Sequence, residues 1–284
     1  MAEKAETWTI RRVLDWTKGY LAERGIDNAR LETEWLLASA LGLDRVGIYL
    51  NLDKPLKAEE LASCRALVAR RAKREPLQYI LGSQEFLGLD FLVAPGVLIP
   101  RHDTEVLVEE ALRRAQGART ILDIGVGSGC IAVALAKRLP EAELLGVEKS
   151  AEAMAIAQEN ARRHGVRLTL FEGSLFEPLA DRRFDLIVSN PPYIPTADME
   201  TLQPEVRDFE PQGALDGGPD GLDYYRRIVP EARNHLNGGG WLMVELGIGQ
   251  AADVTAIFVH AGFQDCFSAK DPAGIERVVG GRIP

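Results

Sequence analysis

The residues best suited to chemistry lie in one short stretch, Phe184 to Ile194, which reads FDLIVSNPPYI. Pro191 and Pro192 donate no backbone hydrogen bonds and fix φ, so they hold Asn190 and Tyr193 stiffly on either side. The Asn190 side-chain oxygen and the Pro191 carbonyl oxygen can each accept one N–H of a planar amino group. The Tyr193 ring can stack on such a group. We therefore expect catalytic roles for Asn190, Pro191 and Tyr193, and substrate binding by all four residues.

A second stretch, LDIGVGSGCIAVALA, combines a strand end with glycines at positions 125, 127 and 129. Glycine allows a tight turn and close backbone approach, and the helix that follows offers free N–H groups to a polar ligand. The next strand ends in Glu148, which is suited to pair with both ribose hydroxyls of an adenosine ligand. The spacing G-x-G-x-G departs from the G-x-G-x-x-G of nicotinamide-binding folds, which stay open as an alternative. In this order the features resemble the class I methyltransferases, which bind S-adenosylmethionine.

The two stretches together suggest methyl transfer to an amino group. A planar amino group is a poor nucleophile because its lone pair is delocalised, so activation must come from positioning. Two acceptor oxygens that hold its N–H bonds direct the lone pair and stabilise the charge that develops. No histidine or cysteine near the motif suggests a covalent intermediate, and no strong general base is needed if the proton leaves after transfer.

The elements that must position these residues read as an α/β fold. Beyond Asp103, strand-like and helix-like runs alternate at a spacing that predicts right-handed crossovers and a doubly wound, Rossmann-like sheet. We expect seven strands, mostly parallel, with the last two, FQDCFSA and IERVVGG, forming an antiparallel edge hairpin. The first and fourth strands of such a sheet are neighbours, so the glycine turn and Asn190 should face one crevice.

The first 83 residues predict a small helical bundle instead. Apolar residues recur at helical spacing, and we expect helices over Ile10 to Gly25, Asn28 to Leu41, Arg45 to Leu50, and Lys57 to Arg74. The basic residues of the last helix are interpreted as a solvated face rather than as a docking patch for an acidic partner. Residues 84–100 predict a β-hairpin linker, and residues 101–284 the methyltransferase domain.

The composition of the chain limits which classes of function the site could have. The chain has 284 residues with 46% hydrophobic content, enough for one large domain and a small one. No apolar run approaches the ~18 residues of a membrane span, and the segment MAEKAETWTIRR lacks the core of a secretory signal, so we expect a cytoplasmic protein. The net charge of −9 disfavours direct nucleic-acid binding. Three dispersed cysteines are expected to be buried, and no metal site is indicated.

Three further stretches make the resemblance to one family of methyltransferases more specific. They are REPLQYILGSQEFLGLDFLVAPGVLIPR, SNPPYI, and EPQGALDGGPDGLDYYRRI, which begin at Arg74, Ser189 and Glu210. N-P-P-Y alone is shared by several amino-group methyltransferases. With the helical N-terminal region, the combination resembles the peptide chain release factor glutamine methyltransferases, the PrmC or HemK family, over essentially the whole chain.

The resemblance implies an acceptor, a cofactor and a set of site residues. The acceptor is the side-chain amide nitrogen (N5) of the glutamine in the Gly-Gly-Gln loop of class 1 release factors, gripped by Asn190 to Tyr193. The cofactor is S-adenosylmethionine, and its expected contacts are Gly125, Val126, Gly127, Ser128, Gly129, Glu148, Leu175 and Asn190. The N-terminal bundle would dock the release factor, and a monomer is expected. Ser174 and His102 depart from the family pattern, and His102 is interpreted as a surface or capping residue.

Other acceptors stay open on the motif alone. A sister enzyme acting on a glutamine of a ribosomal protein shares N-P-P-Y and a helical extension. A nucleic-acid adenine N6-methyltransferase would need a basic groove and a means of extracting a base from its stack. A binding module without catalysis would hold S-adenosylmethionine and transfer nothing.

Overall fold

The protein is described here by a computed structural model that covers residues 7–284. The chain divides into two compact units, one ending at Gly82 and one running from Ser83 to Pro284. Residues 1–6 lie outside the described residues. They include the start of the expected helical domain and part of the segment MAEKAETWTIRR, which lacks the core of a secretory signal.

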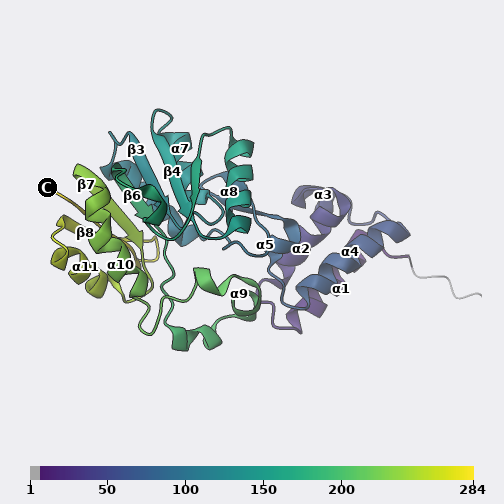
Figure 1. The fold of residues 1–284 in the computed structure, drawn as a ribbon. Coiled ribbons are helices and arrows are strands. Elements are labelled where there is room, and N and C mark those ends of the chain that lie inside the picture. The colour runs from purple at the N-terminus through teal and green to yellow at the C-terminus, as the bar shows by residue number, and fades with distance from the viewer. Residues whose placement is uncertain (1–6) are drawn as a thin grey trace, which may run out of the picture. The chain divides into compact units, whose positions relative to one another are not determined.

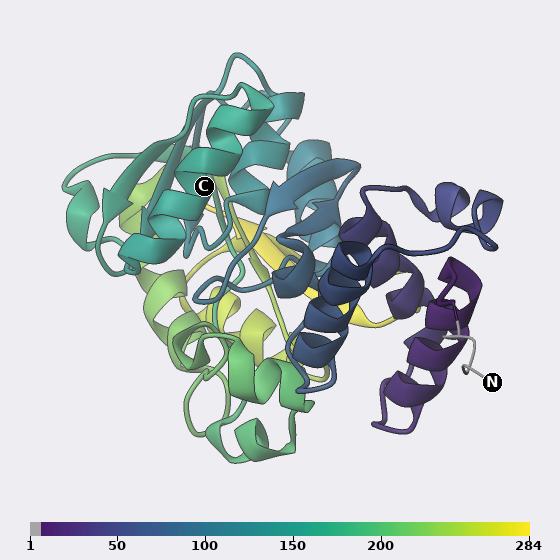
Figure 2. The same cartoon turned by 90° about the vertical axis from the view of Figure 1, so that its right-hand side faces the viewer.

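The N-terminal unit is helical, as its apolar spacing predicts. Its helices are α1 (Ile10–Ala22), α2 (Ala29–Leu41), α3 (Arg45–Leu50), α4 (Ala58–Arg71) and α5 (Leu77–Leu81). Thr9 caps α1 by accepting a hydrogen bond from the Arg12 amide at 3.4 Å, and α2 ends at Gly42, which has φ of +62°. Figure 2 shows these helices in purple and dark blue. Ile10, Leu37 and Ile48, each fully buried, are part of the core that holds α1, α2 and α3 together.

The basic residues of α4 do not all form a solvated face, so that interpretation was partly wrong. Arg71 is 4% exposed and is paired with Glu32 of α2. Arg70 pairs with Glu75 at 2.5 Å, close to the start of α5. The helix also ends at Arg71, earlier than expected, and the chain continues through Pro76 into α5, which the sequence did not indicate. A carboxylate partner from α2 thus makes one of these arginines part of the bundle core.

The second unit contains a sheet of seven strands within the described chain, ordered β5-β4-β3-β6-β7-β9-β8. The strands are β3 (Thr120–Ile124), β4 (Glu143–Glu148), β5 (Thr169–Glu172), β6 (Phe184–Ser189), β7 (Leu236–Glu245), β8 (Gln264–Lys270) and β9 (Glu276–Arg282). The first five pair in parallel, while β9 runs antiparallel to both β7 and β8. This confirms the expected fold class, including β3 beside β6 and a hairpin at one edge (Figure 1).

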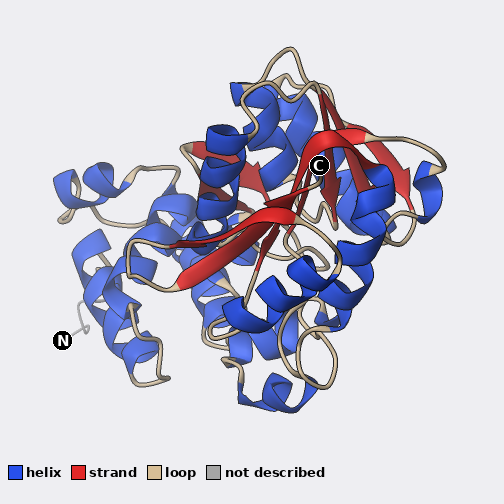
Figure 3. Cartoon of the chain, turned by 90° about the vertical axis from the view of Figure 1, so that its left-hand side faces the viewer, coloured by secondary structure: helices blue, strands red, loops and turns tan. Residues whose placement is uncertain are grey.

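Helices cover both faces of this sheet, as Figure 3 shows in blue against red strands. The helices are α6 (Glu105–Arg114), α7 (Cys130–Arg138), α8 (Ala151–His164), α9 (Pro204–Phe209), α10 (Asp223–Ala232) and α11 (Ala251–His260). Side chains alternate across each strand, so Ile121 of β3 packs with α6 to α8 on one face, and Leu122 packs with α10 and α11 on the other. Both layers are needed because a parallel sheet is apolar on both faces.

The predicted hairpin consists of β1 (Ser83–Phe86) and β2 (Leu89–Leu92), and it belongs to the second unit. Asn160 of α8, which is fully buried, accepts from the Leu92 amide at 2.8 Å and donates to the Leu92 carbonyl at 3.0 Å. Its amide nitrogen also donates to the Ser128 carbonyl at 2.8 Å. One side chain thus connects the end of β2, α8 and the glycine turn.

Several expectations from composition can be compared with this fold. Cys64 and Cys130 are buried, whereas Cys266 is only half-buried, so the expectation for Cys266 was wrong. Every helix in residues 7–284 is too short or too polar to cross a bilayer. Within the same residues, no group of three or more histidine, cysteine or acidic side chains could hold a metal ion.

We predict that Asn160→Ala lowers the free energy of unfolding by about 2–4 kcal/mol, because it leaves the half-buried Leu92 amide and the Leu92 and Ser128 carbonyls without this partner. Urea unfolding followed by circular dichroism measures the change. Asn28→Ala is the matched control, because Asn28 is exposed and its side chain caps no helix amide. Equal stability of the two variants would contradict the connecting role of Asn160.

Candidate active site

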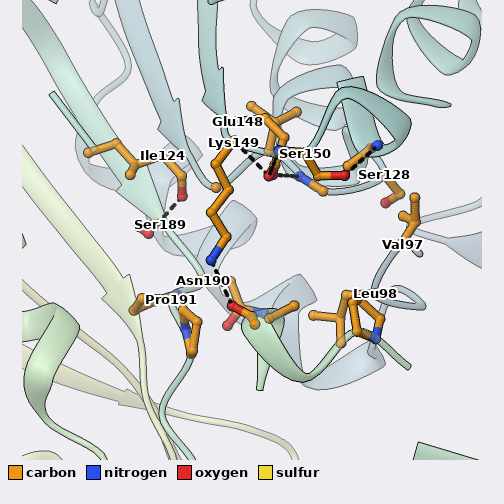
Figure 4. Close-up of a pocket in the computed structure, with 18 of the residues that line it drawn as sticks. Val97, Leu98, Ile124, Ser128, Glu148, Lys149, Ser150, Ser189, Asn190 and Pro191 are labelled. Carbon is orange, nitrogen blue, oxygen red and sulfur yellow. Dashed lines mark hydrogen bonds between the residues drawn. The ribbon is translucent and has the colours of Figure 1, made fainter. Parts of the chain in front are cut away.

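A cavity of about 410 Å³ opens at the carboxyl ends of β3, β4 and β6. This volume is within the range of small-molecule sites. Of the residues expected in the site, the cavity is lined by Gly125, Val126, Gly127, Ser128, Glu148, Leu175, Asn190, Pro191 and Pro192. Gly129 and Tyr193 do not line it. Figure 4 shows Glu148 and the Asn190–Pro191 pair on different sides of this cavity.

The glycine turn forms because its backbone adopts conformations that disfavour other residues. Gly125, Gly127 and Gly129 have φ of +75°, +56° and +81°. Gly129 begins α7, and a Cβ there would meet the Cβ of Ala157 at 3.2 Å. It therefore allows α7 to pack closely against α8 instead of contacting a ligand. Gly125 and Gly127 face the cavity with no side chain in the way.

Glu148 ends β4 and is held by three backbone amides. One carboxylate oxygen accepts from Gly127 at 3.0 Å, and the other accepts from Lys149 at 2.8 Å and Ser150 at 3.0 Å. Glu148 is only 9% exposed, so these bonds fix its carboxylate beside the glycine turn. A carboxylate so held retains lone pairs that can accept from hydroxyl groups of a ligand.

Asn190 follows β6 directly, and its orientation is set by a residue from another element. Its side-chain nitrogen donates to the Thr104 hydroxyl at 3.2 Å. Thr104 is 2% exposed and also lines the cavity. Since the nitrogen end of the carboxamide is committed to Thr104, the oxygen end is left for another hydrogen bond. Thr104 is the last residue of the 3-10 turn His102–Thr104 and directly precedes α6.

The side chains of the two prolines and of Tyr193 lie in different places around the bend. Pro191 and Pro192 line the cavity, whereas the Tyr193 ring packs against the apolar layer of α10 and α11. The Tyr193 hydroxyl donates to Glu245 at the end of β7, at 3.4 Å. Burial raises the pKa of the Tyr193 phenol, and the nearby Glu245 raises it further. The Tyr193 side chain is therefore a neutral hydroxyl near the site, and stacking on a substrate stays a prediction.

The residues that depart from the family pattern lie in different places. Leu175 has φ of +53°, and with Ser174 it lines the cavity. The His102 side chain is 68% exposed and its Nδ1 lies 3.1 Å from Glu105. This position fits the surface role expected for His102.

Two polar contacts that sequence reasoning missed hold the cavity walls. Glu210 is 5% exposed and accepts from Arg101 at 2.5 Å and from the Ile99 amide at 3.1 Å. Lys149 extends across the cavity in Figure 4, where its ammonium group donates to the Gly213 carbonyl at 3.4 Å. Both join segments more than 60 residues apart, so no local sequence pattern could have indicated them.

Two carboxyl groups are buried near the site without an ion-pair partner among the described residues. Asp123 on β3 is fully buried, and both of its oxygens lack a hydrogen-bond partner among the described residues. Burial and, to a lesser extent, the charge of Glu148 raise the pKa of Asp123 to about 7. Burial likewise raises the pKa of Glu245 to about 7, although hydrogen bonds from the Thr104 and Tyr193 side chains oppose this.

The arrangement can orient a flat amino group. The Asn190 oxygen and the Pro191 backbone belong to a rigid bend, and they share one cavity with Glu148 and the glycine turn. None of these groups is a nucleophile, so the geometry suits positioning rather than covalent catalysis.

The chain is similar to known proteins in both of its units. The family model of the PrmC N-terminal domain matches residues 12–82, and that of the methyltransferase small domain matches residues 100–204. A release factor glutamine methyltransferase from Geobacter sulfurreducens is 75% identical over 283 residues, which is all of both chains. One from Moorella thermoacetica is 45% identical over 87% of this chain and 88% of its own.

A solved structure supports the fold. The Thermus thermophilus 16S rRNA N2 G1207 methyltransferase, solved with AdoMet and guanosine, has a TM-score of 0.52 at 21% identity, covering 71% of this chain and 50% of its own.

We predict that Asp123 makes the protein less stable as the pH rises. The folded state keeps the Asp123 proton up to about pH 7, whereas the unfolded chain releases it near pH 4. The folded state thus binds more protons between these values, and its free energy of unfolding falls as pH rises through this window. Asp123→Asn should remove this part of the decrease, on the order of 4 kcal/mol at most between pH 4 and 8.

Urea unfolding at pH 5 and pH 8 measures the effect. Asp253→Asn, at an exposed position of α11, should have the same free energy of unfolding as the unmodified protein at pH 5 and at pH 8. If the free energy of unfolding of Asp123→Asn changes between pH 5 and pH 8 as much as that of the unmodified protein, the buried carboxyl does not titrate in this range.

Proposed function

The chain belongs to the release factor glutamine methyltransferase family, and from this premise we propose its reaction. It transfers a methyl group from S-adenosylmethionine to the side-chain amide nitrogen (N5) of the glutamine in the Gly-Gly-Gln motif of class 1 peptide chain release factors. The observation that carries the choice of acceptor is the identity over the full length of the Geobacter sulfurreducens enzyme. The geometry at Asn190 independently supports transfer to a planar amide.

The residues of the cavity fit S-adenosylmethionine. The glycine turn leaves room at Gly125 and Gly127, where a Cβ would meet no atom within 4 Å or only a backbone oxygen at that distance. Glu148 supplies carboxylate oxygens to hydroxyl groups, and Leu175 supplies an apolar wall. The acidic Glu148 also favours a positively charged ligand. When bound, this cofactor supplies a methyl group attached to a positively charged sulfur.

The chain's own residues activate the acceptor by holding it. The Asn190 carboxamide oxygen and the Pro191 carbonyl oxygen accept the two N–H bonds of the glutamine amide, and Pro192 keeps the bend rigid. These contacts direct the nitrogen lone pair and stabilise the positive charge that develops on the nitrogen. The proton leaves after transfer, when the charged nitrogen is strongly acidic, so no dedicated base is required.

We predict that Asn190→Ala leaves S-adenosylmethionine binding nearly unchanged and lowers methyl transfer by at least ~100-fold, the scale of losing one oriented polar contact. Calorimetric titration measures cofactor binding, and transfer of a labelled methyl group to a release factor measures turnover. Turnover equal to that of the unmodified protein would contradict the role given to Asn190.

The acceptor is tested with the same labelled cofactor. A purified class 1 release factor should be methylated, while a ribosomal protein and a release factor with glutamate in place of the Gly-Gly-Gln glutamine should not. Labelling of the ribosomal protein alone would assign the chain to the sister activity.

The N-terminal unit is proposed to dock the release factor. Among the described residues, large apolar side chains are exposed mostly in this unit: Trp16, Leu31, Trp35, Val46, Tyr49 and Leu50. The second unit exposes Ile248 and Val259. Apolar and aromatic side chains of this kind are enriched at protein interfaces.

We predict that Trp16→Ala raises the KM for an intact release factor about tenfold, the loss of one aromatic interface contact, with kcat unchanged. Trp16 is 52% exposed and Val259 is 60% exposed, so Val259→Ala serves as the control for losing an exposed apolar side chain. Steady-state kinetics with varied release factor measure both. A KM equal in the two variants would exclude Trp16 from the docking surface.

A further inference from the structure

The bend after β6 is only partly fixed by its own residues. Proline fixes φ of Pro191 and of Pro192, and the second ring also restricts ψ of Pro191 to extended values over about 40°. Rotation about ψ of Pro192 and about the backbone bonds of the next residue is not restricted by the motif. The position of the Pro191 carbonyl oxygen therefore depends on what holds the chain after Pro192.

We propose that Gln250 and the loop of residues 215–221 hold the backbone after Pro192, and that they thereby position the Pro191 carbonyl for the acceptor amide. Gln250 and Gly217 are positioning residues in this inference, which rests on the proposed function. They act through the backbone of the bend and need no contact with either substrate.

Gln250 directly precedes α11 and holds the bend by its carboxamide. Its side-chain nitrogen donates to the Tyr193 carbonyl at 2.9 Å and to the Gly221 carbonyl at 3.4 Å. Its side-chain oxygen accepts from the Gly247 amide at 2.9 Å. A backbone amide only donates and a carbonyl only accepts, so these partners distinguish the two ends of the carboxamide. One half-buried side chain thus connects the chain after β7 with the bend.

The 215–221 loop pairs with the chain directly after the bend. The Ile194 amide donates to the Leu215 carbonyl at 3.0 Å, and the Ile194 carbonyl accepts from the Gly217 amide at 2.8 Å. These two bonds form a parallel bridge between Ile194 and Asp216. Both polar backbone groups of Ile194 are therefore held, two residues after the second proline.

This loop contains glycine where the bend lies directly against it. Gly217 is buried, and a Cβ there would meet the Pro192 carbonyl oxygen and the Tyr193 Cα, each at 2.8 Å. Both are backbone atoms, so they can move aside only if the bend moves. A Cβ at Gly221 would likewise overlap the Tyr193 carbonyl oxygen. Gly217 does not have positive φ, so lack of space alone excludes a side chain from that position.

These contacts adjoin the reacting groups without belonging to the cofactor site. Neither Gln250 nor Gly217 lines the cavity. The carbonyl that Gln250 holds is the second one after the Pro191 carbonyl, and rigid peptide planes transmit a displacement from one to the other. A misplacement of about 1 Å at a reacting group can lower a rate about 100-fold. Loss of these contacts should therefore impair methyl transfer and leave cofactor binding unchanged.

The first test is Gln250→Glu, with kcat expressed per cofactor-binding site counted by calorimetric titration. The variant keeps the acceptor for the Gly247 amide but places a carboxylate oxygen against the Tyr193 carbonyl. An acid before α11 is compatible with the helix dipole, so the fold should be retained. We expect kcat to fall ~10- to 100-fold, with the KM for release factor and the affinity for S-adenosylmethionine unchanged. Gln264→Glu, at an exposed position of β8, is the control for the added charge.

The second test displaces the bend from the other side. Gly217→Ala should lower kcat about tenfold or more, again with cofactor affinity unchanged, because its Cβ pushes on the backbone of the bend. Gly117→Ala is the matched control, because a Cβ at Gly117 would meet no atom within 4 Å.

Each result supports or overturns the inference. A kcat in Gln250→Glu equal to that in Gln264→Glu, or in Gly217→Ala equal to that in Gly117→Ala, overturns it. If Gly217→Ala does not fold, Gln250→Glu decides alone. If Gln250→Glu loses cofactor-binding sites in proportion to turnover, the contacts serve only stability and the inference is wrong. If the unmodified protein transfers no methyl group to the release factor, the proposed function fails instead.

Discussion

The site depends on the position of β3 between β4 and β6. Chain connections leave β3 in opposite directions at this point, so the loops after the three strands diverge and leave a crevice between them. The glycine turn follows β3, Glu148 ends β4, and Asn190 follows β6. Register pairs Ile124 with both Val147 and Ser189, so the three strands end at one level. The glycine turn and the bend from Asn190 to Pro192 are thereby brought together by backbone pairing alone.

This placement has a cost in stability. The carboxyl ends of the central strands are the deepest part of the sheet, and Asp123 and Glu245 lie there with unsatisfied oxygens. Burying a carboxyl group without a cation raises its pKa and weakens the folded state wherever the group is ionised. The rest of the fold offsets this with two apolar layers, one on each face of the sheet. A site that needs ionised or polar groups in a dry environment gains stronger electrostatic interactions from the same burial.

Much of this architecture follows from local sequence. Glycines at 125, 127 and 129 predict a tight turn because few other residues tolerate positive φ, and Pro191–Pro192 predict a strand end because proline cannot donate to a ladder. The period of apolar residues locates the helices and strands, and their alternation gives the order of the sheet. The places of Gly125, Gly127 and Glu148 along the cavity were predictable for this reason, since each lies in or directly after a strand that ends there, and their contact with a cofactor stays a prediction.

The residues that sequence reasoning missed all act across long separations. Thr104 and Asn190 are 86 positions apart, and Arg101 and Glu210 are 109 apart. A single threonine or arginine carries no pattern that identifies its partner, because side-chain contacts of this kind depend on the completed packing. Tyr193 shows the same limit of sequence reasoning for a residue inside the motif. Its place in the motif predicts a ring beside the substrate, and that stays a prediction, whereas the contact of the ring with the apolar layer of α10 and α11 could not be read from the motif.

The chemistry explains why such distant contacts matter. An amide nitrogen reacts only when its lone pair is directed toward the methyl group. The enzyme therefore contributes the orientation of the amide rather than a strong base or nucleophile. Angles are set by the groups behind the reactive residue, and for Asn190 that group is the Thr104 hydroxyl, which lies just before the start of α6. A carboxamide is a suitable choice for this task only because its surroundings tell oxygen from nitrogen. The motif that is easiest to recognise in the sequence therefore depends on residues outside it for the one property that makes it useful.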